Sequence, residues 1–260
     1  MSSMASDPRI AGGAPARHGR PRVLGHRGAS ADAPENTLAA FRLAMEQGAD
    51  GVELDVWRCA TGELVVVHDE DMRRTGGAPL SVPGSSFREL RALDAGGWKG
   101  PRFAGERVPR LEEVFEALPG AFVNVELKSR GRSDLEAAPA AAEVIRAARA
   151  ADRVIVSSFD WWLVAAFRRA SPEIPVGLLL EGSRLWPLRL ALGLRLLAPA
   201  AVHPDRALVT PERMATWRAR GLGVNVWTVD GEDELRRLAA LGATSVITNA
   251  PGKALAALAR

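Results

Sequence analysis

The chain has 260 residues, of which 47% are hydrophobic and 25% charged, a composition that favours a soluble globular domain and excludes disordered and fibrous classes. The formal net charge is +3, and 34 basic residues, only three of them lysine, are scattered among 31 acidic ones. Because the basic residues form no run, a nucleic-acid partner is not expected. Cys59 is the only cysteine, which excludes an internal disulfide and a multi-cysteine metal site.

The first 21 residues are predicted to form a disordered N-terminal tail. They combine glycine and proline with Arg9, Arg17 and Arg20, and they lack the apolar core of about 7 to 15 residues that a signal peptide requires. Residues 22–260 then form one domain. The absence of a signal peptide and the single cysteine make a reducing, cytoplasmic location the default expectation.

From Arg22 onward, short β-branched runs alternate with longer helical stretches, the pattern of βα units around a parallel sheet. The predicted strands are Val23–His26, Gly51–Trp57, Phe122–Lys128, Val154–Ser157, Val176–Leu179, Ala200–His203, Val224–Val229 and Ser245–Thr248. The predicted helices are Asn36–Gln47, Leu111–Leu118, Leu135–Ala150, Trp161–Ala170, Trp186–Leu197, Pro211–Arg220, Glu232–Leu241 and Pro251–Ala259. Eight strands, each followed by a helix, predict an α/β fold of the (β/α)8 TIM-barrel type.

Residues 64–109 depart from this alternation. A strand-like run, Leu64–Asp69, is followed by sequence rich in glycine, proline and serine that is too long for an ordinary connection between a strand and a helix. We therefore expect a small insertion after the second strand. It should lie on the catalytic face of the barrel, where it can act as a wall or lid over a substrate.

The most apolar segment, Leu185–Val202, raises the question of a membrane contact. Arg189 and Arg195 argue against a transmembrane span, because a central arginine costs about 2.5 to 3.5 kcal/mol on insertion scales. A barrel helix packed on the strands is the preferred interpretation. The alternative is a basic amphipathic helix on a membrane surface, which leaves a weak membrane-surface contact open.

Polar residues end several apolar strands, which is where a barrel places its catalytic groups. Glu53 and Asp55 are two residues apart on one strand, so their side chains point to the same face, about 6 to 7 Å apart at the backbone. Glu126 and Lys128 repeat this spacing on the next strand. Clustered carboxylates are stable only if they share protons, pair with cations or bind a metal. Oxygen ligands favour hard ions, so the sequence predicts a Ca²⁺ or Mg²⁺ site.

Two histidines, His26 and His68, also follow runs of apolar β residues. A histidine pair beside a metal suits general acid and general base roles. His18 lies in the predicted tail, and for His203, at the end of the sixth strand, a contact with substrate stays open. Arg27 lies at the turn after the first strand, where its guanidinium can bind two phosphate oxygens.

Motifs in order and spacing carry a resemblance to a known family. The main segments are HRGASADAPENTLAAF (26–41), GVELDVWRCATGELVVVHD (51–69), FAGERVPRLEEV (103–114) and VNVELK (123–128), and the later ones are VNVWTVD (224–230) and SVITNAPG (245–252). Together they closely resemble the glycerophosphodiester phosphodiesterase family over nearly all of residues 22–258. The resemblance implies a (β/α)8 catalytic barrel with a small insertion after the second strand.

The resemblance also implies roles for individual residues. The implied site consists of the metal ligands Glu53, Asp55 and Glu126, the acid/base pair His26 and His68, the phosphate contacts Arg27 and Lys128, and the pocket residue Trp227. Asn249 stands where the family often has aspartate, and Asp230 where it often has asparagine. We expect these two departures to alter the rim of the pocket rather than the chemistry.

The expected function is metal-dependent hydrolysis of a small-molecule glycerophosphodiester to glycerol 3-phosphate and an alcohol, with one histidine as base and the other as acid. The nucleophile stays open between water and the neighbouring glycerol hydroxyl, which would form a cyclic phosphate. One alternative is a lipid phosphodiesterase of the lysophospholipase D type, favoured if Leu185–Val202 is exposed. Another is a barrel that binds glycerophosphate-type ligands without catalysis.

Overall fold

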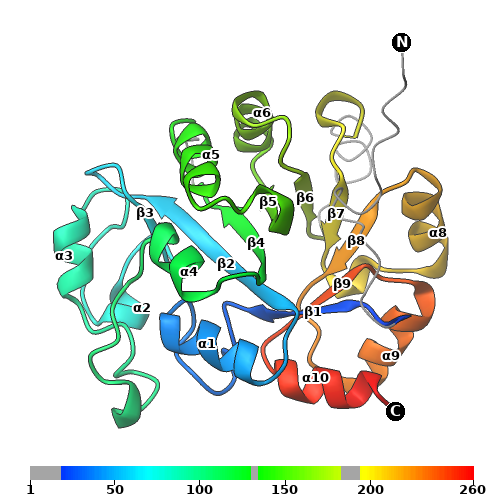
Figure 1. Cartoon of the computed structure of the whole chain (residues 1–260), viewed down its shortest axis with the longest axis horizontal. Helices are drawn as coiled ribbons and strands as arrows, with labels where there is room; N and C mark the ends of the chain where they lie inside the picture. Colours follow the sequence, from blue (N-terminus) through cyan, green and yellow to red (C-terminus); the bar gives the residue numbers. More distant parts are fainter. Residues whose placement is uncertain (1–18, 130–133, 183–193) are drawn as a thin grey trace.

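The computed structural model describes residues 19–129, 134–182 and 194–260. In this part of the chain, eight parallel strands form a closed barrel, whose arrangement is drawn in Figure 1. The barrel closes because β1 (Arg22–His26) pairs with both β2 (Gly51–Arg58) and the last strand, β9 (Ser245–Thr248). The barrel strands are β1 (Arg22–His26), β2 (Gly51–Arg58), β4 (Phe122–Leu127), β5 (Val154–Ser158), β6 (Val176–Leu180), β7 (Ala201–Pro204), β8 (Gly223–Val226) and β9 (Ser245–Thr248). The predicted TIM barrel is confirmed.

Helices follow the strands and cover the outside of the barrel (Figure 1). They are α1 (Leu38–Glu46), α4 (Leu111–Ala117), α5 (Ala137–Ala147), α6 (Trp161–Ala170), α8 (Pro211–Ala219), α9 (Glu232–Leu241) and α10 (Pro251–Leu258), with 3₁₀ turns η3 (Ala151–Arg153) and η4 (Arg206–Leu208). The predicted helix Trp186–Leu197 lies mostly outside the described residues, of which 194–197 are helical. Most of the predicted tail also lies outside them, but Arg20 forms an ion pair with Asp50 at 2.6 Å.

Several elements are shorter than predicted, for local reasons. Helix α1 begins at Leu38 rather than Asn36, because the Thr37 hydroxyl accepts a hydrogen bond from the Ala40 amide and caps the helix. Strand β8 ends at Val226, since Trp227 leaves the ladder with β9 and forms a bridge to Asp205 after β7. These differences assign two residues before α1 and three residues after β8 to loops.

Polar side chains fill the middle of the barrel. The ring of His203 on β7 is fully buried, and its nitrogens lie 2.9 Å from Asn225 Nδ2 and 3.4 Å from Asn124 Nδ2. Gly177 on β6 leaves room for this ring, because a Cβ there would lie 2.3 Å from His203 Nε2. Burial lowers the pKa of His203 to about 3. His203 is therefore a neutral packing residue of the interior, and the hypothesis that it touches substrate is not supported.

The predicted insertion is present beside β2 and contains the short strand β3 (Leu64–Val66), which is antiparallel to β2. It continues with α2 (Arg73–Gly76), α3 (Phe87–Ala92) and the 3₁₀ turn η2 (Pro101–Phe103). The insertion has a small core of its own, made of Trp57, Cys59, Val65, Val67, Met72, Val82, Leu90, Ala95 and Val108. This separate core holds the insertion in a defined place at the side of the barrel (Figure 1).

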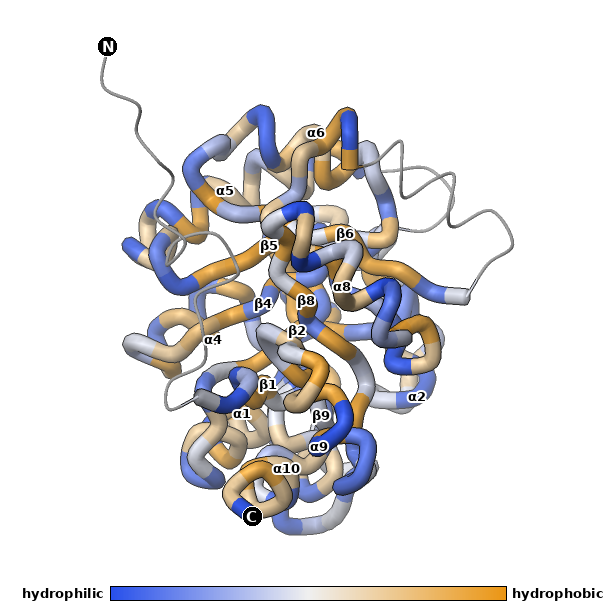
Figure 2. The backbone as a smooth tube through the Cα atoms, turned by 90° about the vertical axis from the view of Figure 1, so that its right-hand side faces the viewer, coloured by the Kyte–Doolittle hydropathy of each residue, from blue (hydrophilic) through white to orange (hydrophobic). Residues whose placement is uncertain are grey.

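The main hydrophobic core lies between the strands and the surrounding helices. In Figure 2, where the chain is coloured by residue hydropathy, hydrophobic residues are concentrated along the central strands and hydrophilic residues in the outer loops. In the part of the chain that the structure describes, no helix is both long and apolar enough to cross a lipid bilayer.

Candidate active site

Three carboxylates converge at the carboxyl ends of β2 and β4. Glu53 and Asp55 lie on β2, and Glu126 lies directly beside Asp55 in the parallel register of β4. All three residues are buried, and one oxygen of each lies within 4.8 Å of the others. Because side chains alternate along a strand, this spacing puts all three on the inner face. The predicted convergence of the three acids is confirmed.

Burial and mutual repulsion split the three acids into two kinds. Burial, reinforced by Asp55 and Glu126, raises the pKa of Glu53 well above its ordinary value. Burial also raises the pKa of Glu126 to about 7, although Lys128 opposes the shift. For Asp55, burial favours a higher pKa, but Lys128 and Arg27 outweigh it and hold the pKa below its ordinary value. Asp55 is therefore firmly ionised, whereas Glu53 and Glu126 resist ionisation.

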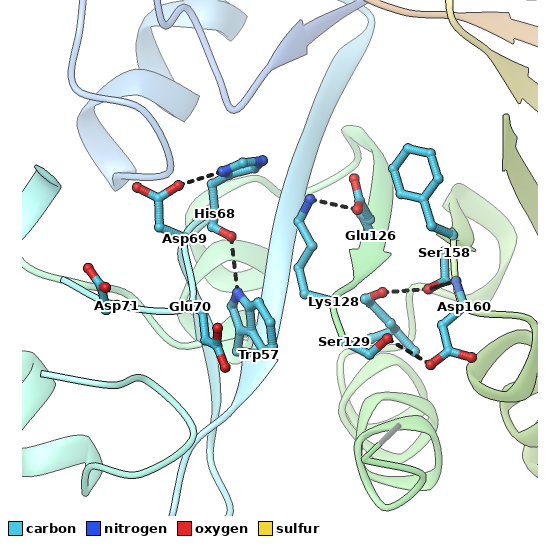
Figure 3. Close-up of a pocket in the computed structure, with 12 residues that line it drawn as sticks. Trp57, His68, Asp69, Glu70, Asp71, Glu126, Lys128, Ser129, Ser158 and Asp160 are labelled. Atoms are coloured by element: carbon cyan, nitrogen blue, oxygen red, sulfur yellow. Dashed lines mark hydrogen bonds and ion pairs between the residues drawn. The ribbon is translucent and has the colours of Figure 1, made fainter. Parts of the chain in front are cut away.

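Two cationic side chains lie against the carboxylates. Lys128 Nζ is 2.8 Å from Asp55 Oδ1 and 2.6 Å from Glu126 Oε1, and Figure 3 shows the second contact. Arg27 Nε is 3.2 Å from Asp55 Oδ2, but among the described residues this buried nitrogen has no hydrogen-bond acceptor in good geometry. Strand β4 ends at Leu127, so Lys128 is the first residue beyond the strand.

The carboxylate cluster fits a hard divalent cation. Ca²⁺ and Mg²⁺ bind oxygens at about 2.0 to 2.6 Å, so two oxygens on one ion lie at most about 5 Å apart, and the 4.8 Å spread meets this limit. Charge gives a second argument. Burial and the mutual repulsion of the carboxylates raise the pKa values of Glu53 and Glu126, and a divalent cation among the three acids would offset that repulsion.

His26 ends β1 and lies beside Glu53 in the parallel register. Its Nδ1 is 2.7 Å from the side-chain oxygen of Asn249, which can only accept, so Nδ1 carries the proton and Nε2 is a free acceptor. Nε2 lies 4.0 Å from Glu53 Oε2, at the edge of the carboxylate cluster. Burial and the nearby Arg27 lower the pKa of His26, although the Asn249 contact opposes them.

Asn249 is expected from the sequence to alter the rim of the pocket rather than the chemistry, and the structure places its side chain against the ring of His26. It bonds directly to the His26 ring, while its amide nitrogen donates to Asp230 Oδ2 at 2.7 Å. Asp230 also accepts from the Thr248 hydroxyl and from the Asn249 backbone amide, both at 2.8 Å. The uncharged side chain of this Asn–Asp pair therefore faces the histidine, and the charged one lies behind it.

His68 lies opposite Lys128 and Glu126, on the loop after β3 (Figure 3). Its Nδ1 is 2.8 Å from Asp69 Oδ1, and since an ionised carboxylate only accepts, Nδ1 carries the proton. The His68 backbone carbonyl accepts from Trp57 Nε1 at 3.1 Å, which anchors the loop on β2. Burial lowers the pKa of His68, although Asp55 opposes the shift.

Two cavities meet at these side chains. One of about 450 Å³ is lined by Trp57, His68, Asp69, Glu70, Asp71, Glu126, Leu127, Lys128, Ser129, Ser158, Phe159 and Asp160 (Figure 3). A smaller one of about 70 Å³ is lined by His26, Arg27, Glu53, His68, Asn124, Glu126, Lys128, Phe159, Leu179, Trp227 and Ile247. The rings of Phe159 and Trp227 meet edge to face, 5.7 Å apart. Seven of the eight predicted site residues therefore line the smaller cavity. The eighth, Asp55, is buried and lies behind Arg27 and Lys128.

Known proteins resemble this chain over nearly its whole length. The model of the glycerophosphoryl diester phosphodiesterase family matches residues 26–253. A glycerophosphodiester phosphodiesterase of Caldanaerobacter subterraneus subsp. tengcongensis is 36% identical over 235 residues, which cover 88% of this chain and 94% of that protein. This chain belongs to the glycerophosphoryl diester phosphodiesterase family. It is therefore a phosphoric diester hydrolase.

Solved structures of similar proteins agree with this family assignment. The structure of an Oleispira antarctica phosphodiesterase in complex with the product sn-glycerol-3-phosphate has a TM-score of 0.86 and 31% identity, covering 93% of this chain and 98% of that one. The crystal structure of a glycerophosphodiester phosphodiesterase from Thermotoga maritima has a TM-score of 0.77 and 29% identity, covering 92% of this chain and 99% of that one.

Sequence reasoning missed several residues around the site of this phosphodiesterase. Phe159 directly follows β5, so its position at a strand end was a usable signal, and it lines both cavities. Glu35 accepts from Arg27 NH1 at 2.8 Å and from Arg74, which lies on α2 of the insertion. Glu35 lies in the loop between β1 and α1, nine residues after the end of the strand, and Arg74 lies in the insertion, so only the folded chain brings this pair together at the site.

Proposed function

We propose that this enzyme hydrolyses glycerophosphodiesters to glycerol 3-phosphate and an alcohol, with a divalent metal ion as cofactor. The observation that carries the proposal is the buried cluster of Glu53, Asp55 and Glu126 beside two histidines, in a member of the glycerophosphoryl diester phosphodiesterase family. The product complex of the Oleispira antarctica relative supports glycerol 3-phosphate as the product.

Glu53, Asp55 and Glu126 would hold the ion, which we propose to be Ca²⁺ or Mg²⁺, because these hard ions prefer carboxylate oxygens. Such an ion supplies Lewis-acid stabilisation of the negative charge that develops on the phosphate. Arg27 and Lys128 would bind the non-bridging phosphate oxygens, since both side chains line the smaller cavity. Trp227 would form part of the pocket wall.

The surroundings of the two histidines suggest different roles. His26 is held neutral by burial, its Nδ1 contacts an uncharged amide, and its Nε2 is free to accept a proton, so we assign it as the general base. His68 instead pairs with the Asp69 carboxylate, which opposes the lowering of its pKa by burial. It also lines the 450 Å³ cavity, where the leaving alcohol would lie, so we assign it as the general acid. The proton that His26 accepts comes from water or from the neighbouring glycerol hydroxyl.

General acid and base catalysis contributes about 10² to 10⁴ in rate, roughly 3 to 5 kcal/mol, which is too little for diester cleavage by itself. Charge stabilisation by Arg27, Lys128 and the proposed metal site must supply much of the remainder.

We therefore expect release of glycerol 3-phosphate from glycerophosphocholine and glycerophosphoethanolamine with Ca²⁺ or Mg²⁺, and its loss in EDTA. Undiminished release in EDTA would contradict metal dependence, and no release with any metal would contradict the substrate class. A cyclic phosphate seen by phosphorus NMR would identify the glycerol hydroxyl as nucleophile.

Exchanging the Asn249–Asp230 pair should shift the pH dependence of the enzyme. The double variant Asn249→Asp with Asp230→Asn keeps an amide–carboxylate pair but places the carboxylate against His26 Nδ1, 2.7 Å away in the present arrangement. An adjacent carboxylate raises the pKa of a histidine by about 1 unit or more. Because the base must be neutral, the acidic limb of kcat/KM should move to higher pH by a similar amount.

The control for this exchange is the single variant Asp230→Asn, which leaves the amide of Asn249 against His26. It should keep the acidic limb of the wild type in a profile of kcat/KM measured from about pH 5 to pH 8. A double variant with an unshifted limb would show that His26 is not the base whose ionisation governs the reaction.

A lipid phosphodiesterase of the lysophospholipase D type is the second candidate function. Two aromatic side chains favour it, because Phe159 is 41% exposed at the cavity and Trp162, in the first turn of α6, is 72% exposed. Of the segment Leu185–Val202, residues 185–193 lie outside the described residues. Co-sedimentation with phospholipid vesicles, and turnover of long-chain lysolipids, would separate this candidate from one restricted to small diesters.

A further inference from the structure

A continuous series of ion pairs connects the insertion to the barrel through Arg74. The two terminal nitrogens of its guanidinium bind the two oxygens of Glu35 at 2.7 and 2.8 Å, and its Nε donates to Asp69 Oδ2 at 2.7 Å. The other oxygen of Asp69 contacts His68 Nδ1 at 2.8 Å. Glu35 Oε1 also accepts from Arg27 NH1 at 2.8 Å. One guanidinium therefore holds the carboxylate partners of two proposed functional residues.

We infer that Arg74 is a positioning residue of this phosphodiesterase, which fixes His68 through Asp69 and Arg27 through Glu35. The inference rests on the proposed function, in which His68 is the acid and Arg27 a phosphate contact. Arg74 is not among the residues that line either cavity, so it acts through the side chains that it holds.

The chemistry of the guanidinium suits this task. Its planar array of donors engages two carboxylates at once, whereas a lysine ammonium is a point charge that cannot form the same forked contact. Asp69 depends on this support, because its side chain is 30% exposed and can turn toward water. Glu35 is held more tightly, with a side chain only 13% exposed between Arg74 and Arg27.

The insertion brings Arg74 to a fixed place. Met72, just before α2, is fully buried in the core of the insertion, and Thr75 within α2 is 5% exposed. The neighbouring Arg73 has a different environment, since its side chain is 68% exposed and pairs with Asp71 two residues away. Arg73 is therefore a matched control on the same helix, with the same charge and no contact to Glu35 or Asp69 in the described structure.

Kinetics of Arg74→Gln, Arg74→Lys and Arg73→Gln in the full chain test this inference. For Arg74→Gln we expect kcat to fall about 10- to 100-fold, the loss typical when the partner of a site residue is removed. KM should rise as well, because Glu35, the partner of Arg27, is no longer held by Arg74. Arg74→Lys should lie between, and Arg73→Gln should stay within about two-fold of the wild type.

The tautomer of His68 gives a readout that does not depend on turnover. In the metal-free wild type, Asp69 should keep the proton of the neutral ring on Nδ1, which long-range proton–nitrogen NMR detects as one protonated and one unprotonated ring nitrogen. The signals are assigned by their loss in His68→Gln. In Arg74→Gln, where Asp69 is free to rotate, both tautomers should be populated, whereas Arg73→Gln should match the wild type.

The outcomes separate failure of this inference from failure of the proposed function. If the wild type releases no glycerol 3-phosphate, the proposed function fails, and the tautomer comparison still decides whether Arg74 positions His68. An unchanged His68 tautomer in folded Arg74→Gln overturns the inference whatever the rate, and so does a wild-type rate in that variant. If Arg74→Gln does not unfold cooperatively, the same comparisons are made with Arg74→Lys, where wild-type behaviour in both readouts overturns the inference.

Discussion

Glu53→Gln is expected to lower turnover by about 10³-fold or more, while it raises the thermal stability of the metal-free protein. Turnover falls because the amide has no negative charge and one fewer metal-binding oxygen. Stability rises because burial and the neighbouring carboxylates of Asp55 and Glu126 oppose the ionisation of Glu53, as its raised pKa indicates. Each kcal/mol recovered should raise the melting temperature of a domain of this size by about 2 to 4 °C.

The gain in stability should depend on pH. A carboxyl group whose pKa is raised on folding contributes stability that is full below its unfolded pKa, near 4.5, and is lost as pH rises through the folded pKa. Glu126 behaves in the same direction, because burial raises its pKa to about 7. Glu53→Gln removes the loss of stability that comes from the ionisation of Glu53 and leaves the one that comes from Glu126. Its advantage over the wild type should therefore grow between about pH 5 and pH 8 in melts recorded in EDTA.

Added Ca²⁺ or Mg²⁺ gives the complementary measurement. The metal should raise the melting temperature of the wild type, since a ligand that binds only the folded state stabilises it, and the rise should be smaller or absent in Glu53→Gln. Glu234→Gln is the control, because Glu234 lies on α9 and pairs there with Arg237. A metal-induced rise in Glu53→Gln equal to that of the wild type would show that Glu53 is not a ligand.

His26→Ala and His68→Ala are each expected to lower kcat by about 10² to 10⁴ on ordinary glycerophosphodiesters. They should differ on a glycerol phosphate ester of p-nitrophenol, whose anion leaves without protonation. His68→Ala should recover most of the lost activity on that ester, because p-nitrophenolate leaves without receiving a proton from an acid. His26→Ala should stay slow, because a proton must still be removed from the nucleophile.

Metal-induced stabilisation serves as the control for both histidine variants, and it should persist because neither side chain is a proposed ligand. Recovery of His26→Ala instead of His68→Ala would reverse the two assignments. Recovery of neither variant would contradict general acid catalysis by a histidine.

The barrel and the convergence of the three acids could be predicted from the sequence, because both follow from short-range patterns of residues. The alternation of strands and helices predicted the barrel, because eight βα units have to close on one another to cover their apolar faces. The spacing of Glu53 and Asp55 put both on the inner face, and the parallel register placed Glu126 beside them. Element ends were less predictable, as the capping residue Thr37 and the early end of β8 at Val226 show.

The sequence by itself thus determined the fold and the group of acids, histidines and cations on the barrel strands and the loops that follow them, since strand periodicity and parallel register are local rules. The tertiary structure alone decided which partners tune them. Asn249 reaches His26 across 223 residues, and Arg74 reaches Glu35 across 39. The first contact exists because β9 closes the barrel against β1, and the second because the core of the insertion carries α2 to the barrel mouth. Neither packing event leaves a periodic trace in the sequence.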